Sequence, residues 1–342
     1  QVIFAVHFLR RKYATLCALA LFAIFSLFAV FNRDETAVET GGDYIKWVDF
    51  SITNEAMTKA YKYDVKTAGD DNHIDWITLL ALCGEKCGGN FKNFNLSYMD
   101  KCAELLKSGK TAEEICQNGK YFNYYKEAYD GVLGGFVGTY YIKKDGEWCE
   151  NYGLKAFSPV AAGYGFSHYR DFGSSRTYGF KRKHLGNDLM GGIGTPIICV
   201  ESGTVEAMGW NRYGGWRVGI RSFDRKRYYY YAHLRKDFPF NTHLKEGDTV
   251  AAGEVIGYLG MTGYSTKENV NNINIAHLHF GMQIIFDEMQ KDGNNEIWID
   301  VYEITEFLNK NKSAVEKPKD DKNYRRKTEF YERLLTENGG GG

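Results

Sequence analysis

The apolar and polar positions of the chain divide it into segments of different character. Residues 14–31 form an apolar run without a charged side chain. A helix of that length measures about 27 Å, close to the thickness of a bilayer's hydrocarbon core. Basic residues precede the run and acidic residues follow it. The positive-inside rule therefore predicts a single transmembrane anchor, with residues 1–13 in the cytoplasm and the remainder extracytoplasmic.

A cleaved signal peptide is the alternative for this run. Such a peptide ends in a small-x-small cleavage site, whereas Phe31-Asn32-Arg33 closes the run here. The missing cleavage pattern favours a retained anchor, and hence a single-pass protein of the cell membrane. Residues 32–43 are polar, with two glycines, and we interpret them as a linker.

Residues 44–140 have a mostly helical pattern. Between residues 98 and 106, apolar side chains recur at helical spacing. Ser97 is a candidate N-cap for that helix, and Thr111 with Glu114 forms a capping box that opens the next one. We predict a helical domain, whose simplest interpretation is a spacer or binding domain.

Residues 150–305 change to short β-type runs separated by glycine-rich turns. Trp216–Ile220 and Tyr228–Ala232 are two such runs. This pattern predicts a mostly antiparallel β domain. Residues 306–342 are highly charged, which predicts a solvated tail. The expected fold class is α+β multidomain: a transmembrane helix, a helical domain, then the β domain.

Composition narrows the class of protein only slightly. The 342 residues carry 43 basic and 43 acidic side chains, so the formal net charge is zero. That balance argues against a nucleic-acid partner, which favours a basic surface. The chain also has 25 tyrosines and 22 phenylalanines. Tyrosine suits either an aromatic β core or a polar polymer substrate, and we favour the core.

Cysteines add little to the functional picture. Of seven, one lies in the apolar run, and the other six could pair as disulfides outside the cytoplasm. Cys83 and Cys87 lack the second cysteine pair of a zinc ribbon. Cys199, within Pro-Ile-Ile-Cys-Val, is expected to be a buried thiol.

Histidines are few, and half of the eight fall in three short motifs. These are His184-Leu-Gly-Asn-Asp188, Tyr231-Ala-His233-Leu234 and His277-Leu-His279. In a strand, side chains two apart project from the same face, so both histidines of the last motif would point together. The four-residue spacing of the first motif suits a helix, but the surrounding glycines disfavour one. We expect a turn or strand end there.

These residue types together are typical of a zinc site. Zinc favours imidazole nitrogen with one carboxylate, using three protein ligands and leaving a position for water. His184, Asp188 and either His277 or His279 would make that set. The water would have its pKa lowered to roughly 7. His233 and the remaining histidine of the pair could orient the water, take its proton or stabilise the oxyanion.

The three motifs in this order resemble the lysostaphin-type (LytM-like) zinc endopeptidases, which cut peptidoglycan cross-bridges or stem peptides. The resemblance covers roughly residues 157–285 and includes Gly247 to Gly263, similar to the β-hairpin stretch before the family's final motif. It implies a zinc peptidase domain at 150–305. Carried over residue by residue, it implies the zinc ligands His184, Asp188 and His279, and the catalytic, non-ligand histidines His233 and His277.

Two segments beside these motifs are candidates for substrate contacts. Residues 264–276 are longer than the family's usual connection and carry four asparagines, so we expect a groove-edge loop that tunes substrate choice. An inert surface loop is the alternative. Residues 169–178 are expected to wall the groove, where Arg170 and Arg176 either meet a substrate carboxylate or remain solvated loop charges.

Taken together, the sequence predicts a membrane-anchored, extracytoplasmic zinc endopeptidase that hydrolyses peptidoglycan peptides. Two alternatives stay open. One is a non-enzymatic scaffold or activator that uses the same fold to bind the cell wall. The other is a bifunctional wall hydrolase whose helical domain cleaves glycan, although Glu85 and Glu113 carry no specific signal for this.

Overall fold

The computed structural model describes residues 45–117, 119–177 and 181–333, which all belong to one compact unit. The expected cytoplasmic N-terminus, transmembrane anchor and linker, at 1–13, 14–31 and 32–43, lie outside the described residues. Within the described ranges, no helix combines the length and the apolar character needed to cross a membrane.

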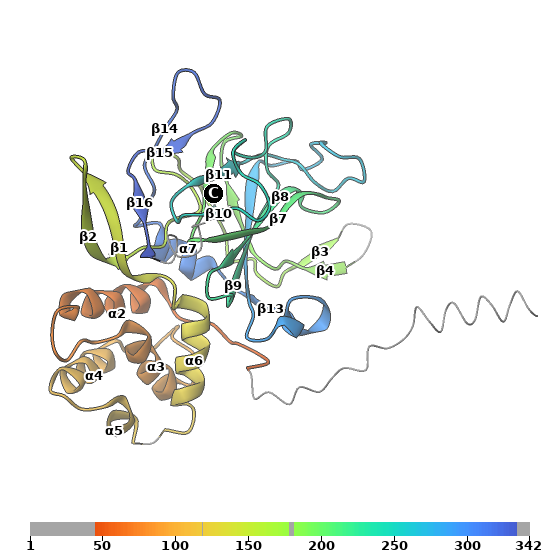
Figure 1. Ribbon diagram of the computed structural model, residues 1–342. Helices are drawn as coiled ribbons and strands as arrows, with labels where there is room; N and C mark the ends of the chain where they lie inside the picture. Colours follow the sequence, from red (N-terminus) through yellow and green to blue (C-terminus); the bar gives the residue numbers. More distant parts are fainter. Residues whose placement is uncertain (1–44, 118, 178–180, 334–342) are drawn as a thin grey trace, which may run out of the picture. The chain divides into compact units, whose positions relative to one another are not determined.

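Five helices fill the segment that was expected to be helical (Figure 1). Their bounds are α2 Asn54–Thr67, α3 Trp76–Cys87, α4 Ser97–Lys107, α5 Ala112–Cys116 and α6 Phe122–Leu133. The central helix is α3, which packs against each of the other four. It buries residues on several sides, as a helix enclosed by others must.

Helix starts agree with the sequence in one case and differ in another. Thr111 and Glu114 form the expected capping box of α5. Ser97, expected to cap α4, is instead its first helical residue. The N–H of Ser97 donates to the Asn95 side-chain oxygen, at 3.0 Å. The upstream asparagine thus supplies the acceptor that was expected from serine.

An antiparallel seven-stranded sheet forms the main β structure within the described residues. Its strand order is β10-β7-β8-β9-β12-β13, and β5 also pairs with β12. The bounds are β5 Asn187–Met190, β7 Gly203–Asn211, β8 Gly215–Ser222, β9 Arg227–Ala232, β10 Thr249–Val250, β12 His277–Ile284 and β13 Ile297–Ile299. This confirms the antiparallel β character that the sequence predicted.

The side chains of β9 alternate between two faces, and this shows where its tyrosines lie. Tyr229 and Tyr231 are fully buried in the core. Tyr228 and Tyr230 point to the opposite face and line a cleft. Because side chains of a strand alternate between its two faces, the run serves the core and the cleft at once.

The stretch Gly247 to Gly263 does not form the expected β-hairpin. Its first strand, β10, pairs with β7, and its second, β11 (Val255–Tyr258), pairs with β6 (Pro196–Ile198). The turn between β10 and β11 forms a hydrogen bond outside the stretch: the N–H of Gly253 donates to the Cys199 carbonyl at 2.8 Å. The two strands are therefore held by two different sheets.

Helices and β structure share a continuous hydrophobic core. A buried cation reinforces the junction. Arg227 of β9 pairs with Glu201 at 2.7 Å and donates to the carbonyl of Gly131 in α6 at 2.9 Å. A hairpin of β1 (Val137–Lys144) and β2 (Glu147–Leu154) then spans the expected interval between the two domains.

The C-terminal segment differs from the solvated tail that was expected. After α7 (Tyr302–Leu308), β14 (Val315–Glu316) pairs with β15 (Arg325–Arg326), and β16 (Phe330–Tyr331) pairs with β1. Aromatic residues spaced among the charges explain the difference. Tyr331 stacks on Tyr141 with ring centroids 4.6 Å apart, and the following carboxylate, Glu332, is buried and accepts a hydrogen bond from Ser202 at 2.6 Å.

All six cysteines of the described residues are free thiols. Cys199 is fully buried, as expected from its apolar surroundings, and burial raises the pKa of its thiol well above the ordinary value.

Candidate metal centre

Strand pairing brings the first two candidate ligands together. Strands β5 and β12 run antiparallel, and their register places Asp188 directly opposite His279. Directly opposed residues of an antiparallel pair project from the same face of the sheet. The Asp188 Oδ1 to His279 Nδ1 distance is 3.0 Å. The sheet register therefore sets one edge of the site.

The third candidate, His184, lies between β4 (Lys181–Lys183) and β5, in a segment that is not helical. This confirms the expected turn or strand end. Gly186 lets the turn approach β12 closely, since a Cβ there would lie 2.7 Å from the ring of His279 and 2.7 Å from the carbonyl oxygen of Phe280. A glycine at this position is thus required by the packing of the site.

Three donor atoms form an equilateral triangle. His184 Nε2, His279 Nδ1 and Asp188 Oδ1 are each 3.0 Å from the other two. An ion bound tetrahedrally at about 2.0–2.1 Å from each ligand separates the ligand atoms by about 3.3 Å. Two nitrogens and one carboxylate oxygen, converging at nearly this spacing, fit a zinc ion. The described residues contain this one such metal-binding group.

The charge state of the triangle suits a cation. Burial raises the pKa of Asp188, but hydrogen bonds from His184 and His279 outweigh it and hold that pKa well below its usual range. Burial lowers the pKa of His279. An ionised carboxylate and a neutral imidazole are the forms in which these groups bind metal.

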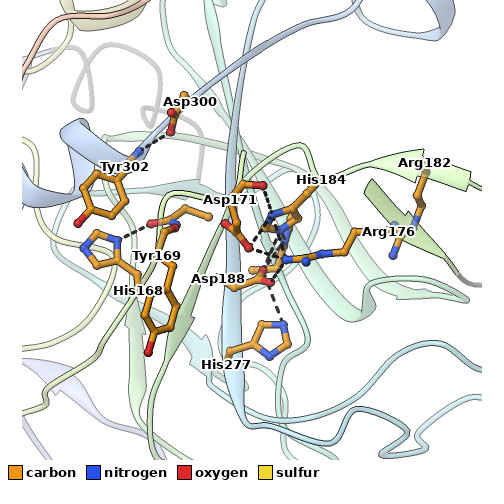
Figure 2. A network of polar contacts seen from close by, with 12 residues as sticks. His168, Tyr169, Asp171, Arg176, Arg182, His184, Asp188, His277, Asp300 and Tyr302 are labelled. Carbon is orange, nitrogen blue, oxygen red and sulfur yellow. Dashed lines mark hydrogen bonds and ion pairs between the residues drawn. The ribbon is translucent and has the colours of Figure 1, made fainter. Parts of the chain in front are cut away.

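A second layer of polar contacts supports the triangle from behind (Figure 2). The other ring nitrogen of His184, Nδ1, lies 3.2 Å from Asp171 Oδ2. Arg176 donates to Asp171 Oδ2 at 2.5 Å and to Asp188 Oδ2 at 3.1 Å. An orienting carboxylate behind a ligand histidine fixes the ring and its tautomer. Asp171 thus leaves His184 Nε2 to face the metal position.

These contacts change the interpretation of the segment at 169–178. Arg176 is engaged with the candidate ligand Asp188, whereas Arg170 stays exposed to solvent and pairs with Glu303. Asp171 was missed by sequence reasoning. Its only signal was its place in a segment expected to wall the groove.

Both remaining motif histidines turn one nitrogen toward the cleft. His233 Nδ1 donates to the Thr262 carbonyl at 2.9 Å, and His277 Nδ1 donates to the Ile275 carbonyl at 2.7 Å. Because a carbonyl only accepts, each Nδ1 carries a proton, and the free acceptor of a ring in that tautomer is Nε2. The His277 Nε2 lies 3.7 Å from Asp188 Oδ1.

His233 has an unusual backbone and an unusual pKa. Its φ is 62°, in the left-handed region that few residues other than glycine adopt. Burial first, and then the charges of His277 and His279, lower the pKa of its imidazole well below the ordinary value. The rings of His233 and His277 lie 4.8 Å apart, nearly perpendicular. The structure thus gathers all five sequence-predicted site residues.

The site opens into a cleft of about 1310 Å³. Of the long connection at 264–276, Tyr264 lines this cleft. Asn269 instead accepts from Trp216 Nε1 at 3.0 Å and donates to Asp237 at 2.6 Å, which ties the loop to the body of the domain. The loop's effect on substrate choice stays a prediction.

Comparison with known proteins agrees with this geometry. Residues 182–294 match peptidase family M23. An L-Ala–D-Glu endopeptidase of Bacillus subtilis is 33% identical over 180 residues, which cover 53% of this chain and 52% of the relative. Lysostaphin of Staphylococcus simulans is 39% identical over 98 residues, which cover 28% of this chain and 17% of lysostaphin. A crystal structure from Ruminococcus gnavus, described as a LytM-type glycyl-glycine endopeptidase, shares the fold with a TM-score of 0.50 at 20% identity, covering 79% of this chain and 92% of that one.

A His-Asp-His group on an antiparallel sheet, open to a cleft, agrees with the metallopeptidase family that this region matches. Residues 182–294 of the chain are similar to peptidase family M23, and the relatives matched there include lysostaphin. The chain spans about half the length of the Bacillus relative and less than a fifth of lysostaphin.

Proposed function

We propose that this protein is a zinc endopeptidase that hydrolyses peptide bonds in the stem or cross-bridge peptides of peptidoglycan. The observation that carries the proposal is the equilateral triangle of His184, Asp188 and His279 donor atoms at the cleft. The similarity to an L-Ala–D-Glu endopeptidase and to lysostaphin supports the substrate class.

His184 Nε2, Asp188 Oδ1 and His279 Nδ1 would hold the zinc ion. Three protein ligands leave a coordination position for water or substrate, as catalytic zinc sites require. When bound, zinc supplies a Lewis acid for the scissile carbonyl and lowers the pKa of water. Asp171 and Arg176 keep the ligands in place from behind.

His233 and His277 would handle the proton and the developing negative charge. Each holds a proton on Nδ1 through a backbone carbonyl, so each Nε2 can accept a proton in the cleft. Once protonated, either imidazolium can stabilise an oxyanion or return the proton to the leaving amine. The lowered pKa of His233 keeps its ring neutral before reaction.

The two alternatives lack a comparable observation. A wall-binding scaffold has no need of a complete donor triangle with two further histidines beside it. In the helical segment, Glu85 accepts a hydrogen bond from the backbone N–H of Tyr121 at 2.9 Å, a structural contact at the start of α6. Endopeptidase activity therefore remains the better proposal.

The test is digestion of purified peptidoglycan, with mass spectrometry to identify the new ends. New amino and carboxyl ends at a peptide bond, lost on chelation and restored by zinc, are the expected result. New reducing sugar ends would reveal glycan cleavage instead. Binding of the wall without any new ends would favour the scaffold.

We also propose that residues 14–31 anchor the enzyme in the cell membrane, with the peptidase domain at the cell wall. The apolar length of that run and the basic residues before it support this topology. Protease added to intact protoplasts should degrade the C-terminal domain and spare the first dozen residues. Protection of that domain would contradict the topology.

A further inference from the structure

Two arginines in the cleft lack a carboxylate partner. Arg182 of β4 and Arg217 of β8 both line the cleft, and neither forms an ion pair with any carboxylate of the described residues. In each, one guanidinium nitrogen is buried without a hydrogen-bond acceptor: Nε of Arg182 and Nη1 of Arg217. An unsatisfied buried donor is costly, so these groups favour a ligand that accepts hydrogen bonds.

Several other charged groups of the cleft form ion pairs within the chain. Arg176 bonds to Asp171 and Asp188. Glu206 pairs with Arg221 at 2.7 Å and also with a lysine, Lys291. Lys183, Asp292 and Glu296 also line the cleft and form no ion pair within the described residues. Arg182 and Arg217 are the arginines of the lining that have no carboxylate partner there.

Aromatic rings position Arg182, and the sheet register positions Arg217. The Arg182 guanidinium lies over the rings of Tyr213 and Tyr264, at 5.3 and 5.0 Å from their centroids. Gly219 of β8 lies opposite Tyr230 of β9, so Arg217, two residues from Gly219, is on the same face of the sheet as Tyr230. The Tyr230 ring in turn packs edge-on against the ring of His279, at 5.9 Å.

The sheet sets the approximate distance from Arg217 to the metal position. Strand β9 separates β8, which carries Arg217, from β12, which carries His279. Two strand spacings amount to about 10 Å. An extended peptide covers that distance in about three residues, and fewer when the arginine side chain reaches back.

We propose that Arg182 and Arg217 form a carboxylate-binding subsite, so that the enzyme selects acidic peptides over neutral ones. A guanidinium offers parallel N–H donors that match the two oxygens of a carboxylate. This inference rests on the proposed function and narrows its substrate: a stem peptide with a free carboxylate near the scissile bond, in preference to an uncharged oligoglycine bridge.

The experiment compares three synthetic peptides with the zinc-loaded protein: a stem peptide with a free glutamate carboxylate, the same peptide amidated at that carboxylate, and pentaglycine. A fourth peptide, amidated at its C-terminal carboxylate instead, shows which of the two carboxylates binds the arginines. Wild type should prefer the acidic peptide by at least about tenfold in kcat/KM, as expected for a charge-assisted hydrogen bond.

Arg217→Gln and Arg182→Gln should raise KM for the acidic peptide and reduce the preference, with zinc content unchanged. Arg217→Lys keeps the positive charge but loses the paired N–H donors of the guanidinium, so it should give an intermediate preference. Arg225→Gln is the matched control, because it removes the same charge but Arg225 is exposed, lies outside the cleft lining and pairs with Glu288. It should keep the full preference.

Equal rates of wild type on the acidic and amidated peptides would overturn the inference, as would a preference that survives in both glutamine variants. Calorimetric binding of the same peptides separates this inference from the proposed function. If no peptide is cleaved, the proposed function fails, yet tighter binding of the acidic peptide that depends on Arg217 would still support the subsite. Equal binding of acidic and amidated peptides would reject it.

Discussion

His279 and Asp188 face each other across the β5–β12 pair, with Nδ1 of one 3.0 Å from Oδ1 of the other. The strand register, and not a flexible loop, thus fixes two corners of the donor triangle. A site built on paired strands holds its geometry before any ion arrives, which reduces the ordering that metal binding must impose.

Removing a triangle residue should abolish zinc binding. His184→Ala, Asp188→Ala and His279→Ala each leave two protein ligands, too few for a stable site. His233→Ala and His277→Ala should retain one zinc per chain but lose peptide hydrolysis. Metal analysis of the five purified variants distinguishes the groups. Zinc lost from His277→Ala but retained by His279→Ala would mean that the two roles are reversed.

Disrupting the contacts behind the triangle should weaken zinc binding without abolishing it. Asp171→Asn removes the carboxylate that orients His184, and Arg176→Gln removes the cation that bridges Asp171 and Asp188. Supporting groups of this kind typically contribute 10–100-fold in metal affinity. Competition with a chromophoric chelator measures the change.

A matched control is available in the same segment. Arg170→Gln removes an equal charge, but the partner of Arg170 is Glu303, away from the triangle. Its zinc affinity should stay within about twofold of wild type. An affinity loss equal to that of Arg176→Gln would show that charge, and not contact with Asp171 and Asp188, explains the effect.

The structure brings together the five residues that the sequence singled out, whereas their surroundings were harder to predict. His277 and His279 stand two apart, as a strand requires, and the resemblance to a known family singled out His184, Asp188 and His233 as well. Asp171 and Arg176 reach the site through the course of a loop, which no periodicity encodes. Likewise, β10 pairs with β7 and β11 pairs with β6 because of the tertiary arrangement of the strands, which the local sequence does not encode.

The C-terminal segment was mispredicted for a different reason. The prediction of a solvated tail rested on the many charged residues of this segment. The few aromatic residues among them determine how it packs. Phe330 and Tyr331 stack on residues of β1, and the neighbouring charges find partners, as Glu332 does with Lys155. A charged segment with regularly placed aromatic residues can therefore pack as an edge strand.

Gly186→Ala should weaken zinc binding, although this glycine is not a ligand. A Cβ at 2.7 Å from the His279 ring and from the Phe280 carbonyl forces the turn or the strand to move. We expect a loss of about 1–3 kcal/mol in the free energy of unfolding, typical of overpacking, together with reduced zinc affinity.

Gly192→Ala is the control for Gly186→Ala. A Cβ at Gly192 would meet its nearest neighbour, the Thr195 hydroxyl, at an ordinary 3.7 Å. Its zinc affinity and thermal midpoint should remain near those of wild type. If Gly186→Ala also binds zinc like wild type, the close approach to His279 has no role in positioning the ligand.

Protonation of His233 should destabilise the fold at acid pH. Burial lowers the pKa of this imidazole well below its value of about 6.5 in the unfolded chain. The unfolded chain therefore binds more protons below pH 6.5, so stability is fully present above that pH and falls as the pH decreases. One such group changes the free energy of unfolding by up to about 1.4 kcal/mol per pH unit.

His233→Asn tests this, because asparagine tolerates the left-handed backbone that His233 adopts. Urea unfolding of the chelated protein at pH 7.5 and pH 5.5 gives the loss of stability for each form. The loss should be smaller in His233→Asn than in wild type. His279, whose pKa burial also lowers, is present in both proteins, so the difference between them reports His233. Equal losses in the two proteins would show that His233 protonates in the folded state without cost.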